Sequence, residues 1–230
     1  MPKAVISNRI YMDLPSDKKA LFDALTYKII NNDGSVKYER IEIIRNYKMV
    51  TPKIVSIPQG RIDLIPKNYE IVDKRIIEFA DFPEPKFGLF PEQQVVYDEV
   101  DGSCFINALV GWGKTFTALH IARKLGMRTL VVTHTTALRD QWIKEVEKLY
   151  GTTPGIIGSG EFDIHNFIVV GNVQSIVKNV GEISKHFGTI IMDEAHHTPA
   201  STFTSIIDSC HSRYRIALSG TMRRKDGKHV

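Results

Sequence analysis

The sequence predicts an α/β fold in which a mostly parallel sheet is flanked by helices and preceded by a small α+β domain. Two observations lead to this prediction. From about residue 94 onward, short apolar runs alternate with amphipathic segments of helical period, and the runs are apolar throughout, as in strands covered on both faces. Before residue 80 the pattern differs, because short apolar runs there alternate with turn signals.

Residues 1–80 are expected to form the small α+β domain. Leu21–Ile30 begins with a helical pattern and ends with a strand pattern, and Lys37–Met49 alternates over part of its length as a half-buried strand does. Between them, Asp33-Gly34 favours a tight turn. Ile54–Pro66 predicts a strand, a turn and a second strand.

Residues 81–93 are predicted to be a linker, because the segment ADFPEPKFGLFPEQ carries three prolines and a glycine and can continue neither a helix nor a sheet ladder. Residues 94–230 hold the alternating pattern. Two amphipathic helices are expected, each ending at a glycine: Lys114–Gly126 and Thr136–Gly151. Strands are expected at Cys104–Val110, Arg128–His134, Asn166–Asn172, Thr189–Ala195 and Tyr214–Gly220.

Composition is that of an ordinary globular protein, with 43% hydrophobic and 24% charged residues among 230. A formal net charge of +4 permits phosphate-rich partners without requiring them. Two cysteines exclude a four-cysteine zinc site and a disulfide framework, which fits a reducing compartment. The first residues lack the apolar core of a signal peptide, and no apolar run is long enough to span a bilayer. We therefore expect a soluble intracellular protein without a membrane partner.

The segment Ala108–Thr115 reads A-x-x-x-x-G-K-T between an expected strand and an expected helix. Gly111 and Gly113 let the backbone curl so that successive N–H groups point into one concavity, which suits phosphate oxygens. Lys114 would then reach the β- and γ-phosphates of a nucleotide, and the Thr115 hydroxyl would hold Mg²⁺. The alternative is a glycine-containing turn with an incidental Gly-Lys-Thr. Trp112 inside the segment either stacks on the nucleotide or packs against a neighbouring segment.

A second motif, MDEAHH at Met192–His197, follows the strand pattern of Thr189–Met192. Asp193 at a strand end is suited to hold Mg²⁺, and Glu194 to orient and deprotonate an attacking water. Two alternatives compete: a capped helix start, and a zinc site formed by His196 and His197, whose adjacent positions on a helix diverge. The two motifs stand about 80 residues apart within one strand–helix alternation, which makes a double accident improbable.

Together these residues resemble the superfamily 2 helicases and translocases of the DEAD/DEAH type. Residues 193–196 read DEAH, and THTTALRDQW, NVQSI and SGT resemble three further motifs in the family's order. LFPEQQ resembles the upstream element whose glutamine reads adenine, which implies that role for Gln93. The resemblance also implies backbone contacts to nucleic acid by Thr135, Gln174 and Ser175, and coupling of hydrolysis to nucleic acid by His196, Ser219 and Thr221. Two departures, His134 for proline and Gly220 for alanine, remove no catalytic group.

The resemblance implies a RecA-like, P-loop NTPase domain that uses ATP and Mg²⁺. Because RRKDG after SGT resembles a run of phage-type branch-migration and repair helicases, it implies a helicase or branch-migration motor for single-stranded, forked or branched DNA. Such a protein would act in repair or recombination, in the cytoplasm of a bacterial host and encoded by a phage. The alternatives are a restriction-type duplex translocase subunit and an ATP-gated DNA-binding module with little hydrolysis.

Two further expectations follow from the resemblance. Family members carry a second RecA-like domain with an arginine finger, which implies that these 230 residues are the N-terminal portion of a motor and hydrolyse ATP very slowly by themselves. Residues 1–80 resemble the small domain of phage-type helicases, which implies a contact with duplex DNA. A solvated face is the alternative reading of the basic stretch there, which comprises Lys37, Arg40, Arg45, Lys48 and Lys53.

Overall fold

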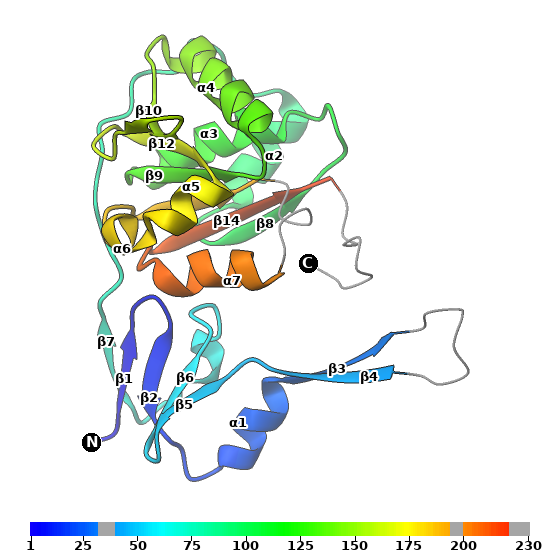
Figure 1. The fold of residues 1–230 in the computed structure, drawn as a ribbon, viewed down its shortest axis with the longest axis vertical. Helices are drawn as coiled ribbons and strands as arrows, with labels where there is room; N and C mark the ends of the chain where they lie inside the picture. The colour runs from blue at the N-terminus through cyan, green and yellow to red at the C-terminus, as the bar shows by residue number, and fades with distance from the viewer. Residues whose placement is uncertain (32–39, 194–199, 221–230) are drawn as a thin grey trace. The chain divides into compact units, whose positions relative to one another are not determined.

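The computed structural model describes residues 1–31, 40–193 and 200–220, in two compact units (Figure 1). The first unit is Met1–Lys74, and the second starts at Arg75. This boundary lies before the expected residue 80 because the intervening backbone is hydrogen-bonded to the second unit. Ile76 N donates to His211 O at 2.8 Å, and Ala80 N donates to Gly126 O at 3.1 Å. The Asp33-Gly34 turn lies outside the described residues.

The first unit is built on a five-stranded sheet in the order β5-β6-β2-β1-β7. A short helix packs beside this sheet. The buried core of the unit includes Ala4, Ile10, Leu25 and Val55. A separate two-stranded ribbon, β3–β4, extends away from this sheet (Figure 1). The elements are β1 Lys3–Ile6, β2 Ile10–Asp13, α1 Lys18–Ala24, β3 Thr26–Asn31, β4 Arg40–Arg45, β5 Lys48–Thr51, β6 Ile54–Ile57 and β7 Glu70–Asp73.

Two predictions for this unit have opposite outcomes. The helix-then-strand pattern of Leu21–Ile30 is confirmed by α1 and β3. The second strand within Ile54–Pro66 is wrong, because Ile62–Leu64 forms a single 3-10 turn. That turn closes when Ile65 N donates to Ile62 O at 3.1 Å, and the following Pro66 has no N–H to offer a sheet ladder.

The second unit contains the predicted sheet, with seven strands in the order β11-β10-β12-β9-β13-β14-β8. All neighbouring pairs are parallel except β10 and β11. The strands are β8 Cys104–Asn107, β9 Thr129–Thr133, β10 Gly155–Gly158, β11 Glu161–Phe162, β12 Ile168–Asn172, β13 Thr189–Met192 and β14 Tyr214–Ser219. The prediction of a mostly parallel sheet is confirmed.

Helices cover both faces of this sheet (Figure 1). One apolar cluster joins Val131 and Ile191 to α3 and α4, and the other joins Leu130 and Ile190 to α5 and α7. Adjacent residues of one strand therefore enter opposite cores, which explains why the strands are apolar throughout. The helices are α2 Pro91–Glu99, α3 Lys114–Leu125, α4 Thr136–Tyr150, α5 Val173–Lys178, α6 Val180–Ile183 and α7 Ala200–Ser209.

The segment predicted as a linker differs at its end. Residues 91–93 form the first turn of α2, because Pro91 stands where a missing N–H costs nothing. The preceding residues are irregular but anchored: Lys86 N donates to Leu149 O at 2.8 Å, and the Phe82 ring packs edge-on against Phe167. Within the described ranges, no helix combines the length and apolar character that crossing a membrane requires.

Candidate nucleotide-binding site

The loop between β8 and α3 has the curled backbone that its glycines predict. Gly111 and Gly113 take φ values of 86° and 95°, a left-handed region that favours glycine. The loop is tied to the neighbouring strand where Ala108 N donates to Ser219 O at 3.2 Å. Gly113 is also the N-cap of α3, so the positive end of that helix faces the loop.

Lys114 is buried at the first turn of α3, where only 9% of the residue is exposed. Its ammonium donates to the carbonyl oxygens of Ala108 at 2.8 Å and Leu109 at 3.2 Å. The cation is therefore held against the loop backbone, in the concavity formed by the turn. A positive charge at that place is suited to neutralise phosphate oxygens.

Gln93 connects the start of α2 to the same loop. Its Oε1 accepts from the backbone N–H of Phe90 at 3.1 Å, and its Nε2 donates to the carbonyl of Trp112 at 2.9 Å. The first bond caps α2, and the second fixes the loop. A Cβ on Gly113 would collide with the Gln93 amide. The φ of Gly113 favours glycine, and a side chain there would displace the Gln93 amide from its bond to Trp112 O.

Asp193 lies directly after β13 and is 7% exposed. Its backbone N–H donates to Val132 O at 3.0 Å, and its Oδ2 accepts from the indole Nε1 of Trp142 at 2.7 Å. Since β13 pairs with β14, and β14 pairs with β8, the carboxylate stands at the same edge of the sheet as the loop between β8 and α3, hereafter the phosphate loop. Glu194, His196 and Thr221 lie outside the described residues.

Ser219 and Gly220 follow β14 at this edge. Ser219 is fully buried, and a Cβ on Gly220 would lie 3.5 Å from Val110 Cγ2 and 3.7 Å from Lys114 Nζ. Both distances are ordinary van der Waals contacts. The alanine usual in the resembling motif would therefore fit, so the glycine departs from that motif without altering the space of the site.

The residues expected to contact nucleic acid stand farther along the same edge. Thr135 is exposed and caps α4, since its Oγ1 accepts from Leu138 N at 3.2 Å. Gln174 is exposed in the first turn of α5, and Ser175 is half-buried beside it. Register pairing of Thr133 with Asn172 brings the ends of β9 and β12 together, and with them the starts of α4 and α5.

Sequence reasoning missed two polar contacts near this edge. The bond from Trp142 to Asp193 joins residues 51 positions apart, so only the folded chain reveals it. Arg139 is 7% exposed, and its Nη1 donates to the hydroxyl of Ser159 at 2.9 Å, in a turn where Ser159 has a φ of 56°. The flanking Gly158 and Gly160 were the only sequence signal for that turn.

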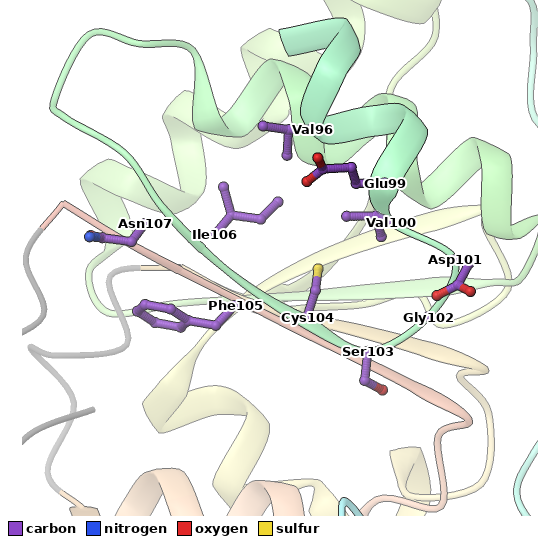
Figure 2. A pocket seen from close by; sticks show the side chains of 10 residues that line it. All are labelled: Val96, Glu99, Val100, Asp101, Gly102, Ser103, Cys104, Phe105, Ile106 and Asn107. Carbon is purple, nitrogen blue, oxygen red and sulfur yellow. The ribbon is translucent and has the colours of Figure 1, made fainter. Parts of the chain in front are cut away.

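A separate hollow of about 380 Å³ lies along β8 and the end of α2 (Figure 2). Glu99 and Asp101 contribute carboxylates to its lining, which repel a triphosphate. The remaining lining residues are Val96, Val100, Gly102, Ser103, Cys104, Phe105, Ile106 and Asn107. The chemistry of this hollow does not suit a nucleotide, whereas that of the phosphate loop does.

The loop residues fit a nucleotide with Mg²⁺. Two left-handed glycines, a buried lysine and a helix start offer donors and positive charge to phosphates. The Thr115 hydroxyl and the Asp193 carboxylate are oxygen donors of the kind that Mg²⁺ prefers. Over the residues that the structure describes, no group of three or more His, Cys, Asp or Glu side chains could hold a metal.

Comparisons with known proteins bear on this site. Residues 68–224 match the family described as the type III restriction enzyme, res subunit. The chain is 42% identical to the probable helicase D10 of Escherichia phage T5, over 99% of this chain and 51% of that protein. It is 35% identical to the DNA 3′-5′ translocase XPB2 of Sulfurisphaera tokodaii, over 52% of this chain and 27% of that protein.

A solved structure shows the same fold. UvsW, a helicase from bacteriophage T4, matches with a TM-score of 0.68 at 19% identity, over 99% of this chain and 53% of that chain. The RecA-like α/β fold is thereby confirmed. The chain spans about half the length of the curated relatives that it matches over most of its own length, namely 51% and 44%.

Proposed function

The chain belongs to the family of the type III restriction enzyme res subunit, within the superfamily 2 helicases, and on this premise we propose that its second unit is the ATP-binding part of a motor that moves on DNA. The single observation that carries the proposal is the phosphate loop, in which a buried Lys114 lies beside two left-handed glycines, at the sheet edge that also bears Asp193.

Each site residue then has a chemical role. Lys114 neutralises the β- and γ-phosphates, while Gly111, Trp112 and Gly113 enclose them with their backbone. Thr115 and Asp193 hold Mg²⁺, which supplies neutralisation of phosphate charge when bound. Glu194 orients the attacking water and accepts its proton. His196, Ser219 and Thr221 transmit the state of the nucleotide to the nucleic-acid edge.

Gln93 is proposed to read adenine. Its amide uses one acceptor position for Phe90 N and one donor for Trp112 O. One further donor and one further acceptor position belong to the same amide, and adenine presents a matching acceptor and donor at N7 and N6. Of two phenylalanines that precede this glutamine in the sequence, Phe82 is packed against Tyr150 and Phe167, whereas Phe87 is 51% exposed and is the one available to stack on the base.

The nucleic-acid partner is proposed to be DNA in single-stranded, forked or branched form. Exposed Thr135 and Gln174, with Ser175 beside them, offer hydroxyl and amide groups at backbone level and no base-reading pattern. The unit Met1–Lys74 is proposed to add a duplex contact. The relative from Escherichia phage T5 supports a phage-type motor. A role in repair or recombination, in the cytoplasm of an infected bacterium, is part of the proposal.

Steady-state ATP hydrolysis by the 230-residue chain, with and without DNA, tests this proposal. A second motor domain with an arginine finger is proposed to be needed for full speed, and such a finger contributes about 10³- to 10⁵-fold in rate. We expect very slow turnover that Lys114→Ala abolishes. Turnover of several per second, stimulated by DNA, would contradict the proposed need for a second domain, and residual turnover unchanged by Lys114→Ala would contradict the site.

The description of the matched family favours one alternative, a duplex translocase of the restriction type. Such a motor tracks along duplex DNA without separating its strands. A strand-displacement assay on forked DNA, beside displacement of a third strand from duplex DNA, distinguishes the two. Strand separation supports the helicase, and third-strand displacement without it supports the translocase.

A further inference from the structure

We propose that Trp142 is a positioning residue for the Mg²⁺ ligand Asp193, and that helix α4 thereby connects the metal site to the nucleic-acid edge. The inference rests on the proposed function, since it takes Asp193 as a ligand of Mg²⁺. Trp142 is the last residue of the THTTALRDQW segment that resembles a family motif, but none of the roles described above is assigned to it.

The contact itself is short and buried. The indole Nε1 of Trp142 donates to Asp193 Oδ2 at 2.7 Å, with Trp142 1% exposed and Asp193 7% exposed. A bond from a neutral donor to a carboxylate at this distance is of the strong, charge-assisted kind. It fixes the rotation of the carboxylate about its Cβ–Cγ bond. The remaining oxygen is thereby held in one orientation relative to the phosphate loop.

The indole is itself held firmly. Trp142 belongs to the apolar cluster that α4 shares with α3 and the sheet, together with Val146 and Leu149 of the same helix. An indole has one donor and no acceptor, and its ring cannot be rotated in a packed core without displacing neighbours. A ligand whose orientation is set by such a donor binds metal more tightly than one left to rotate, because outer contacts orient inner ligands.

Helix α4 carries this contact and a proposed DNA contact at once. Thr135 is its N-cap, and Trp142 follows seven residues later, which places the two on nearly the same side of the helix and about 10 Å apart along its axis. A helix moves as a rigid rod over two turns. A shift of α4 on binding DNA at Thr135 therefore changes the bond between Trp142 and Asp193, and with it the affinity for Mg²⁺.

The experiment measures how Mg²⁺ strengthens binding of a fluorescent ATP analogue to the 230-residue chain. Affinity is determined in EDTA and over a series of Mg²⁺ concentrations, for the wild type, Trp142→Phe and Tyr150→Phe. Tyr150→Phe is the matched control, since it removes another buried hydrogen bond of the same cluster, from the Tyr150 hydroxyl to Leu119 O at 2.9 Å. It leaves Asp193 untouched.

We expect the half-saturating Mg²⁺ concentration to rise about tenfold in Trp142→Phe, in line with the loss of other outer contacts to metal ligands. Affinity in EDTA should be unchanged, and Tyr150→Phe should follow the wild type. Addition of a single-stranded oligonucleotide should shift the Mg²⁺ midpoint of the wild type and leave that of Trp142→Phe unshifted.

Each outcome decides a different claim. If the nucleotide affinity of the wild type does not depend on Mg²⁺ concentration, the proposed metal site itself is contradicted. If the wild type and Trp142→Phe have the same half-saturating Mg²⁺ concentration, the positioning role of Trp142 is overturned. An oligonucleotide that shifts both proteins equally would overturn the connection through α4. If Trp142→Phe unfolds, benzothienylalanine at position 142 keeps the ring shape, lacks the N–H, and decides the same question.

Discussion

At the scale of single residues, substitutions at the two glycines of the phosphate loop distinguish the cost of backbone strain from the cost of a steric clash. Both have positive φ, so an alanine at either position costs about 1–2 kcal/mol in the folded state. A Cβ on Gly111 would meet nothing within 4 Å, whereas a Cβ on Gly113 would strike the Gln93 amide. Gly113→Ala should therefore destabilise the chain more than Gly111→Ala, as measured by urea denaturation.

A double-mutant cycle supplies the control for that prediction. Gln93→Ala removes the obstacle, so the additional cost of Gly113→Ala over Gly111→Ala should shrink in its background. The contact between Gln93 and the loop would not limit this position if the two alanine variants lost equal unfolding free energy. The same conclusion would follow if the loss in Gly113→Ala were the same with and without Gln93→Ala.

The residue scale also shows what a sequence reveals of a site. The glycines and Lys114 could be predicted because the motif is contiguous and its backbone needs are local. The bonds from Gln93 to Trp112 and from Trp142 to Asp193 could not, because they span 19 and 51 positions and depend on how α2 and α4 pack. The roles proposed for Thr115, Thr135 and Gln174 stay predictions.

At the scale of elements, the helices and strands that could be predicted are those with a clear hydrophobic pattern. Strands β9 and β13 were identifiable because residues entering two cores make a continuous apolar run, and α3 and α4 because several turns establish an apolar face. Helices α5 and α6 have six and four residues, too few for a helical period to appear. Their existence depends on packing against the sheet, which local sequence does not report.

Helix α3 gives a prediction for pH. His120 packs edge-on against Phe116 with ring centroids 4.9 Å apart, and its Nε2 has no hydrogen-bond partner among the described residues. Burial lowers the pKa of His120 below its usual value of 6.5, and Arg123 acts in the same direction, against a bond to the Phe87 backbone that raises it. Folding therefore favours the neutral ring.

A depressed pKa in the folded state means that stability is complete above about pH 6.5 and falls as the pH drops below it. The unfolding free energy should decrease between pH 7.5 and pH 5.5, and His120→Leu should lose less over that interval. Burial also lowers the pKa of His211. The unfolding free energy of His120→Leu should therefore still decrease in part as the pH falls. A variant with the full wild-type loss would show that His120 does not contribute.

At the scale of the whole molecule, the two units suggest a division of labour in DNA binding. Arg45 and Lys53 are exposed on the first unit, within the basic stretch. If they contact duplex phosphates, Arg45→Gln with Lys53→Gln should reduce the slope of log affinity against log salt by about 0.9 for each charge. Lys18→Gln with Lys19→Gln, exposed on α1, is the matched control.

Deletion of residues 1–74 extends this test and respects the boundary that the structure draws. Duplex affinity should fall more than single-strand affinity, because the second unit retains Thr135, Gln174 and Ser175. Unchanged duplex affinity and slope, in both the deletion and the charge variants, would assign the first unit another task.

The central claim is that Ala108–Thr115 and Asp193 form an ATP site, and equilibrium binding of Mg-ATP tests it most directly. A fluorescent ATP analogue is titrated against the wild type, Lys114→Ala and Lys124→Ala, the last an exposed lysine of the same helix. We predict saturable binding by the wild type and Lys124→Ala, and at least a tenfold loss in Lys114→Ala, since that ammonium neutralises phosphate in the ground state. Equal binding by all three proteins would contradict the account.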